Sequence, residues 1–332
     1  MAYTKKNRLT AEEYLAGILA GDRVILAMAI TLVESQLEED RTIAEAIIEQ
    51  VSNRGEKSIR IGVTGVPGVG KSTFIESFGE YVISQNKKLA VLAIDPSSTK
   101  TGGSILGDKT RMENLAKNPN AFIRPSASRL ALGGVTHKTR EAVLLCEAAG
   151  FDVIIIETVG VGQSEVAVRE LVDFSLLLML AGAGDELQGI KKGIMEMADA
   201  IAITKADGDN VLMSEQAKKL YQNALHLFPV ADNGWLPKVT TCSALKNEGM
   251  DEIWKMLLHF ADDMRSNGFW KENRNVQQLA WMHSAIEQSL RADFYNDKHV
   301  KSVLKTVENQ VQEGTQTAWS AAKQLLSLFY KK

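Results

Sequence analysis

The sequence predicts an α/β fold in which a mostly parallel β-sheet is flanked by helices. From residue 59 onward, short apolar runs rich in β-branched residues alternate with segments of helical periodicity. Runs this short and this apolar are typical of strands covered on both faces, and strands that alternate with helices form parallel sheets. Residues 10–53 and the chain after residue 247 show helical periodicity only. The sheet is therefore expected in the middle of the chain.

Six segments have strand character, and the chain before and after them is predicted to be helical. The predicted strands are residues 59–65, 88–95, 151–160, 174–182, 199–207 and 238–244. Long amphipathic helices are predicted for residues 248–268, 275–296 and 301–330. The predicted domains are an N-terminal helical segment (1–55), a nucleotide-binding domain (56–265) and a C-terminal helical arm (266–332).

The C-terminal helices carry more apolar surface than the edge of one sheet needs. Their predicted exposed stripe includes Trp254, Trp270, Trp281 and Trp319. Such a stripe favours a homodimer formed through the arm, and packing back onto the same subunit is an equally good interpretation.

Composition and charge narrow the classes of partner. The net charge of −3 gives no electrostatic footprint for nucleic acid or an anionic membrane. The most apolar run, residues 176–184, is shorter than the roughly 20 residues that span a bilayer. Cys146 and Cys242 lie far apart, so a disulfide framework or a thiolate metal site is not indicated. The first twenty residues do not resemble a signal or transit peptide, and we predict a cytoplasmic protein.

The segment GVTGVPGVGKST, residues 62–73, contains the pattern G-x-x-x-x-G-K-[ST] between a predicted strand and a predicted helix. In that context the pattern predicts a phosphate-binding loop and thus a P-loop NTPase fold. Lys71 is expected to reach the β and γ phosphates, and Ser72 to ligate Mg²⁺. The predicted loop residues are Gly65, Val66, Pro67, Gly68, Val69, Gly70, Lys71, Ser72 and Thr73.

Two acids end predicted strands beside this loop. Asp95 follows the second strand, and Glu157 follows the third. Because ligands of parallel sheets collect at the carboxyl ends of strands, both acids are expected to face the phosphates and the metal. Gln163 follows the glycine-containing segment TVGVG and is a candidate for orienting the attacking water, or simply begins the next helix. The predicted catalytic set is Lys71, Glu157, Asp95 and Gln163.

The base is predicted to be guanine. Thr204, Lys205 and Asp207 form an N/T-K-x-D pattern, in which the carboxylate accepts hydrogen bonds from guanine and the lysine stem covers the ring. The later segment CSALKNEG supplies Ser243, Ala244 and Leu245, whose backbone is expected to contact the guanine carbonyl. Thr204 replaces the commoner Asn, whose amide braces the phosphate loop. We therefore expect weaker nucleotide binding with the guanine preference retained.

At this point the chain resembles the MeaB/ArgK-type GTPases, which are associated with methylmalonyl-CoA mutase and belong to the SIMIBI class. Five segments carry the likeness in family order: GVPGVGKST, AIDPSSTKTGGSILGDKTRM, FIRPSASRLALGGVT, IIIETVGVGQSE and GAGDELQGIKKGIMEMAD. The resemblance implies GTP and GDP as ligands, with Mg²⁺ held by Ser72, Glu157, Asp95 and Asp108. It also implies a switch segment containing Asp185, Gln188 and Lys191.

The resemblance further implies a partner. Relatives act as chaperones of an adenosylcobalamin-dependent acyl-CoA mutase, chiefly methylmalonyl-CoA mutase, and form homodimers through their C-terminal helices. GTP binding and slow hydrolysis gate cofactor loading and protect or reactivate the mutase. The alternatives are a metallochaperone-type SIMIBI GTPase, which the dispersed histidines and unpaired cysteines disfavour, and a P-loop small-molecule kinase or ATPase.

Overall fold

The computed structural model describes residues 8–35, 37–52, 57–94, 112–125, 132–158, 168–182, 192–229 and 231–330. The chain divides into two compact units, Met1–Gln277 and Gln278–Lys332, and each unit is described by itself. Helix α13 (Phe269–Asn296) contributes to both, because the boundary falls within it.

The first unit is built on a parallel β-sheet with the order β3-β2-β4-β1-β5-β6-β7 in the described part of the chain. Its strands are β1 (Ile59–Gly65), β2 (Leu89–Ile94), β3 (Ala121–Pro125), β4 (Val153–Thr158), β5 (Phe174–Leu180), β6 (Ala200–Thr204) and β7 (Lys238–Thr241). β1 lies at the centre of the sheet, between β4 and β5. The carboxyl ends beside a central first strand are where open α/β sheets bind ligands.

All six predicted strands are present, and the sheet confirms the predicted fold class. The sequence did not reveal β3, which pairs with β2 and lies at the edge of the sheet in the described part of the chain. Its five residues include Arg124 and end at Pro125. Edge strands tolerate a charge and a proline, so β3 lacks the unbroken apolar run of a central strand.

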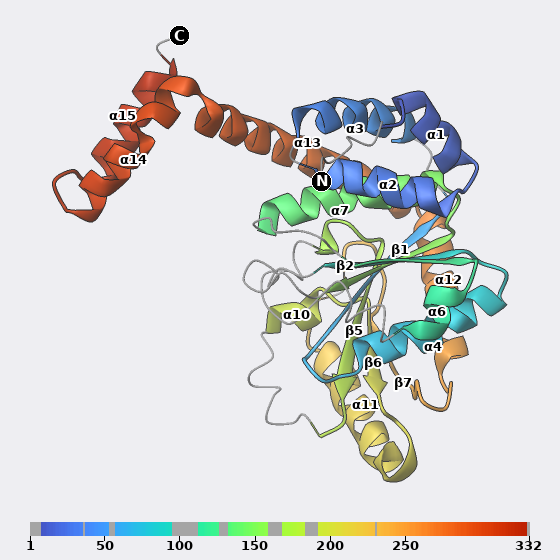
Figure 1. The fold of residues 1–332 in the computed structure, drawn as a ribbon. Helices are drawn as coiled ribbons and strands as arrows, with labels where there is room; N and C mark the ends of the chain where they lie inside the picture. The colour runs from blue at the N-terminus through green and yellow to red at the C-terminus, as the bar shows by residue number, and fades with distance from the viewer. Residues whose placement is uncertain are drawn as a thin grey trace. The chain divides into compact units, whose positions relative to one another are not determined.

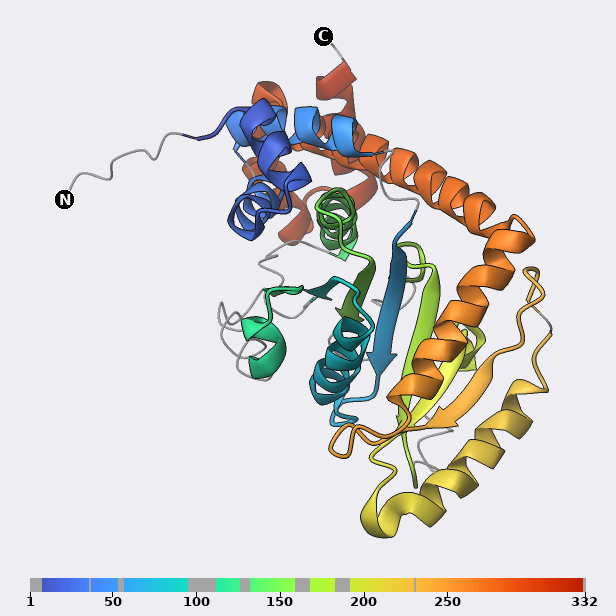
Figure 2. The same ribbon diagram turned by 90° about the vertical axis from the view of Figure 1, so that its right-hand side faces the viewer.

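Helices cover both faces of the sheet and form outer layers (Figures 1 and 2). The helices of this unit are α1 (Ala11–Leu19), α2 (Arg23–Glu34), α3 (Glu38–Val51), α4 (Lys71–Ser84), α6 (Glu113–Lys117), α7 (Leu132–Ala148), α10 (Lys192–Glu196), the 3-10 turn η1 (Gly208–Asn210), α11 (Val211–Leu225) and α12 (Met250–Ser266). α4 packs on β1 and β2 and against α12, whereas α7 packs on β2 and β4. α1, α2 and α3 pack together and contact α7, outside the sheet layer.

The main core lies between the sheet and the layer of α4 and α12. Ile61 of β1, Phe78 of α4 and Trp254 of α12 are all buried there. Trp270, at the start of α13, belongs to the same core. The prediction that Trp254 and Trp270 lie on an exposed stripe was therefore wrong, because helical spacing shows that a face is apolar but not what covers it.

The second unit contains the rest of α13 with α14 (Lys298–Gln312) and α15 (Ala318–Tyr330). The single helix predicted over 301–330 is two helices, because Gly314 adopts a left-handed φ of 74° between them. Val300, Val307, Ala321 and Leu325 form the small core of this unit. Along the part of α13 that belongs to this unit, by contrast, four apolar side chains at helical spacing are exposed: Leu279, Met282, Ile286 and Leu290.

A buried ionic cluster joins four elements at the amino end of β1. The guanidinium of Arg60 donates to both carboxylate oxygens of Glu147 at 2.8 Å. Arg274 of α13 donates to both oxygens of Asp173 at 2.9 and 2.8 Å and to the carbonyl of Ser58. Burial lowers the pKa of Arg60, but the charge and hydrogen bonds of Glu147, together with the charge of Asp173, outweigh burial and the pKa is raised. The cluster therefore holds α7 and the first turns of α13 against the sheet.

Glu147→Gln is expected to lower the free energy of unfolding by about 3 kcal/mol, because it leaves the buried Arg60 charge without its carboxylate. Urea titration measures this change. The matched control is Glu49→Gln on α3, where the side chain is exposed and the effect is expected to stay within about 0.5 kcal/mol. Equal losses in the two variants would contradict the assignment.

Candidate nucleotide-binding site

The phosphate-loop sequence lies between the carboxyl end of β1 and the first residue of α4, as predicted. Gly68 and Gly70 have left-handed φ angles of 79° and 92°. Gly65 lies against β5, so close that a Cβ atom would meet the Leu178 carbonyl oxygen at 2.6 Å. Glycine is required at these points for backbone conformation or for space. The sequence therefore folds into a tight turn that ends on a helix N-terminus.

The amino end of α4 is suited to an anion. Its first backbone N–H groups have no carbonyl partner within the helix, and the helix dipole adds positive potential there. The Lys71 ammonium group lies over the loop and donates to the Gly65 carbonyl at 2.9 Å. The positive charge of Lys71 and the positive end of the helix dipole therefore lie at the same turn.

Ser72 and Glu157 meet at the base of this turn. The Ser72 hydroxyl donates to Glu157 Oε1 at 3.4 Å, and Glu157 is buried. Parallel pairing places Glu157 opposite Val63 of β1, two residues before Gly65. A hydroxyl and a carboxylate are hard oxygen donors, so this pair fits the ligand preferences of Mg²⁺.

Thr204 braces the phosphate loop from β6. Its buried hydroxyl donates to the Val69 carbonyl at 2.8 Å and lies 3.3 Å from the Met179 carbonyl. The brace attributed to Asn at this position is therefore made here by a threonine hydroxyl. The expectation that Thr204 weakens nucleotide binding stays a prediction, but the missing amide has a substitute.

The remaining base-reading residues gather at the ends of β6 and β7. Lys205 adopts a left-handed φ of 57°, and its Nζ donates to the Gly68 carbonyl at 2.9 Å. Asp207 accepts a hydrogen bond of 2.5 Å from the Ser243 hydroxyl. Asn210 donates to the Lys205 carbonyl at 2.7 Å. The two predicted base-reading segments thus contact each other directly.

The structure brings the phosphate loop, Glu157, Thr204–Asp207 and Ser243–Leu245 to the same edge of the sheet. Six predicted residues lie outside the described part of the chain: Asp95, Asp108, Gln163, Asp185, Gln188 and Lys191. Sequence reasoning missed Ser77 and Asn210, which bond to the base-reading segments. No motif marks a serine in the middle of α4.

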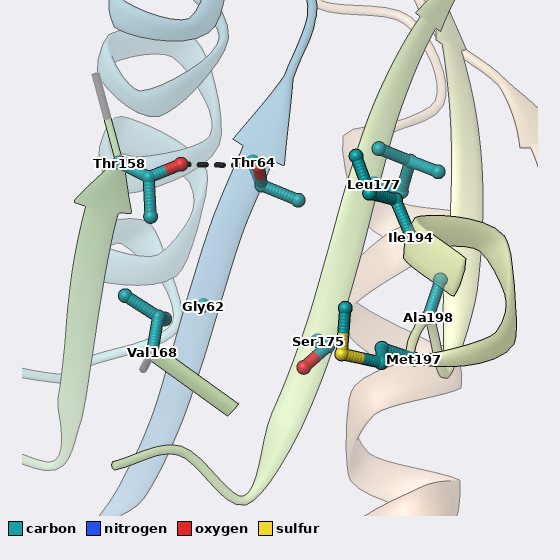
Figure 3. Close-up of a pocket in the computed structure, with 9 residues that line it drawn as sticks. All are labelled: Gly62, Thr64, Thr158, Val168, Ser175, Leu177, Ile194, Met197 and Ala198. Carbon is teal, nitrogen blue, oxygen red and sulfur yellow. Dashed lines mark hydrogen bonds between the residues drawn. The ribbon is translucent and has the colours of Figure 1, made fainter. Parts of the chain in front are cut away.

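A small pocket opens on the sheet face opposite to α4 (Figure 3). Thr64 and Thr158 line one side, where the Thr158 hydroxyl donates to that of Thr64 at 3.0 Å. Leu177 and the α10 residue Ile194 line the other side. The described lining contains no charged side chain and no predicted site residue. The described lining therefore includes none of the side chains predicted to hold the nucleotide.

The residues that the structure describes contain no group of three or more His, Cys, Asp or Glu side chains placed to hold a metal ion. Burial raises the pKa of the Cys242 thiol to about 12. None of the helices in the described ranges combines the length and hydropathy needed to cross a membrane.

A central parallel strand, a phosphate-loop turn and a helix that begins at its lysine define a P-loop NTPase. Residues 26–299 match the family described as methylmalonyl-CoA mutase-associated GTPase MeaB. The chain belongs to this family and is a GTPase that binds GTP and GDP.

Proteins that are similar in sequence match nearly the whole length of this chain. GTPase ArgK of Escherichia coli is 44% identical over 91% of this chain and 93% of its own length. The mitochondrial methylmalonic aciduria type A homolog of Mus musculus is 42% identical over 98% of this chain and 80% of its own length. A crystal structure described as an LAO/AO transport system kinase is 36% identical, with a TM-score of 0.74, and covers 98% of this chain and 99% of that one.

Proposed function

We propose that the site binds GTP with Lys71 and the amino end of α4 on the phosphates, and with Asp207 on the guanine. The residues Gly65–Thr73 cradle the phosphates through backbone N–H groups, and the Lys71 ammonium neutralises charge on the β and γ phosphates. In hydrolysis water attacks the γ phosphorus and GDP leaves. Asp95 is proposed to support this step, and Gln163 is the candidate for orienting that water.

Ser72 and Glu157 are proposed to hold Mg²⁺, because their oxygen atoms lie 3.4 Å apart at the foot of the phosphate loop. Asp95 and Asp108, which lie outside the described residues, are the other two proposed Mg²⁺ ligands. When bound, the ion would draw charge from the β and γ phosphates during hydrolysis.

The guanine preference is proposed to rest on Asp207 and on the backbone of Ala244 and Leu245. A carboxylate accepts from both the ring N1–H and the exocyclic amine of guanine, a pair of donors that adenine does not present. The Ser243 hydroxyl holds that carboxylate in place. The stem of Lys205 is proposed to lie against the face of the base.

Asp207→Asn is expected to weaken GDP binding about 10- to 100-fold, because the hydrogen bonds to a charged acceptor are lost. The variant is expected to gain affinity for xanthosine diphosphate, since an amide can donate to the carbonyl that replaces the guanine amine. Titration with fluorescent nucleotides measures both. Asp209→Asn, at an exposed acid of η1, is the matched control. Unchanged GDP affinity in Asp207→Asn would refute the base role.

We propose further that the protein is a chaperone of an adenosylcobalamin-dependent acyl-CoA mutase, most directly methylmalonyl-CoA mutase. GTP binding and hydrolysis would gate cofactor loading and would protect or reactivate the mutase. The observation that carries this proposal is the match of residues 26–299 to the mutase-associated family. Proposed switch residues Asp185, Gln188 and Lys191 would report the nucleotide state to the partner.

The partner is tested by mixing the purified protein with methylmalonyl-CoA mutase and with a second acyl-CoA mutase. A complex in size-exclusion chromatography and faster GTP hydrolysis are expected with at least one mutase. Adenosylcobalamin loading, followed by absorbance, is expected to depend on GTP. Lys71→Ala is the control that should lose this GTP dependence. No complex and no stimulation with either mutase would overturn the proposal.

A homodimer through the C-terminal arm is proposed from the exposed stripe of Leu279, Met282, Ile286 and Leu290. These positions recur on one face of α13, and their exposed fractions lie between 48% and 60%. An unpaired apolar row of this length suits the same row of a second copy, as in a two-fold symmetric contact.

Ile286→Glu is expected to shift the protein from dimer to monomer, because it places a charge within the apolar row. Sedimentation velocity at several protein concentrations measures the change. Gln288→Glu is the matched control. It introduces the same glutamate side chain two residues after Ile286, about 200° around the helix, and is expected to leave the dimer intact. A monomeric parent protein at every concentration would contradict the homodimer.

A cytoplasmic location stays a prediction, and the mouse relative is described as mitochondrial.

Neither a metallochaperone nor a small-molecule kinase is favoured by a specific feature of the described residues.

A further inference from the structure

The loop that carries Ser243, Ala244 and Leu245 is a closed turn between β7 and α12. Ser243 and Glu248 exchange two backbone hydrogen bonds, each of 3.0 Å. Asn247 turns the chain with a left-handed φ of 56°, which asparagine tolerates better than most residues. Just after it, a Cβ on Gly249 would meet the Thr241 carbonyl oxygen at 2.5 Å. The backbone of this guanine loop, residues 243–249, is therefore defined by its own contacts.

One side of the guanine loop is bonded to the helix that begins at the phosphate loop. The Ser77 hydroxyl of α4 donates to Asn247 Oδ1 at 2.6 Å. Ser77 is 7% exposed and lies six residues after Lys71 on the same helix. Because Ser77 and Lys71 lie on the same helix, the Asn247 amide is bonded to the element that begins at the phosphate-binding turn.

The other side of the guanine loop is bonded to Asp207. Ser243 Oγ donates to the Asp207 carboxylate and accepts from the Lys246 backbone N–H at 3.2 Å. Hydrogen bonds thus join Ser77 of α4 to Asn247 and Ser243 to Asp207, and the closed backbone of the guanine loop connects the two bonds.

We propose that Ser77 and Asn247 are positioning residues, which hold the guanine loop at the correct distance from the phosphate loop. The proposal rests on the proposed role of Asp207 and the loop in reading guanine. A nucleotide spans both ends of the site, and a loop already held in place loses less conformational freedom when the base binds. Without the link, the base contacts weaken while the phosphate contacts are retained.

The test compares a ligand that spans the site with one that fills only its phosphate end. The variants are Ser77→Ala, which removes the hydroxyl, and Asn247→Gly, which removes the amide but favours the left-handed backbone. A fluorescent GDP analogue gives the GDP affinity, and its displacement by magnesium tripolyphosphate gives the phosphate affinity. Ser84→Ala is the matched control, because that hydroxyl donates within α4 to the Tyr81 carbonyl.

Each single variant is expected to bind GDP about three- to tenfold more weakly, the effect of one neutral hydrogen bond. Tripolyphosphate affinity is expected to stay within about twofold of the parent in both. The double variant is expected to lose little more than either single one, since both remove the same bond. Ser84→Ala should match the parent for both ligands.

Unchanged GDP affinity in the single variants would overturn the proposal. Equal losses for GDP and tripolyphosphate would also overturn it, because a general loss of structure affects both ligands alike. If Ser77→Ala does not fold, as judged by circular dichroism, Asn247→Gly decides by the same criteria, since Asn247 is exposed. A parent protein that binds ADP as tightly as GDP would instead refute the proposed recognition of guanine. Failure of the positioning role and failure of guanine recognition thus give different results.

Discussion

The hydrogen bond from the Thr204 hydroxyl to the Val69 carbonyl is the contact on which the geometry of the site depends. It ties the end of β6, which leads into the proposed base-reading residues, to the turn whose N–H groups are proposed to bind the phosphates. Lys205 adds a second bond to the same turn, at Gly68. Thr204 ends the buried strand β6, and Lys205 follows it directly. The two bonds therefore fix the turn to the sheet and not only to its own backbone.

The end of β1 opposite to the phosphate loop is held by the buried ionic cluster. Arg60 lies on β1, five residues before Gly65, and its charge is matched by Glu147 of α7. Arg274 places α13 against Asp173, at the start of β5. Removal of one partner from a buried pair of this kind is costly, because the remaining charge stays buried without compensation. These pairs fix which helices lie beside the central strand.

Much of the fold and the site could be predicted from local pattern alone. The apolar runs identified β1, β2 and β4–β7, and the motif spacing placed Lys71, Ser72 and Asp207 at one edge of the sheet. β3 escaped because an edge strand needs no unbroken apolar run. Trp254 was placed on the surface because periodicity cannot show that α4 covers that face. Ser77 had no signal, because its partner is 170 residues away.

The contacts of Thr204, Lys205 and Ser77 have a common consequence for the chemistry. Each joins an element proposed to read the base to an element proposed to bind the phosphates. The segments proposed to recognise the base and those proposed to bind the phosphates therefore share one hydrogen-bonded framework, which sets the distance between them. At the position where an asparagine is commoner, a buried donor aimed at the Val69 carbonyl is retained. The hydroxyl supplies that donor from the end of β6.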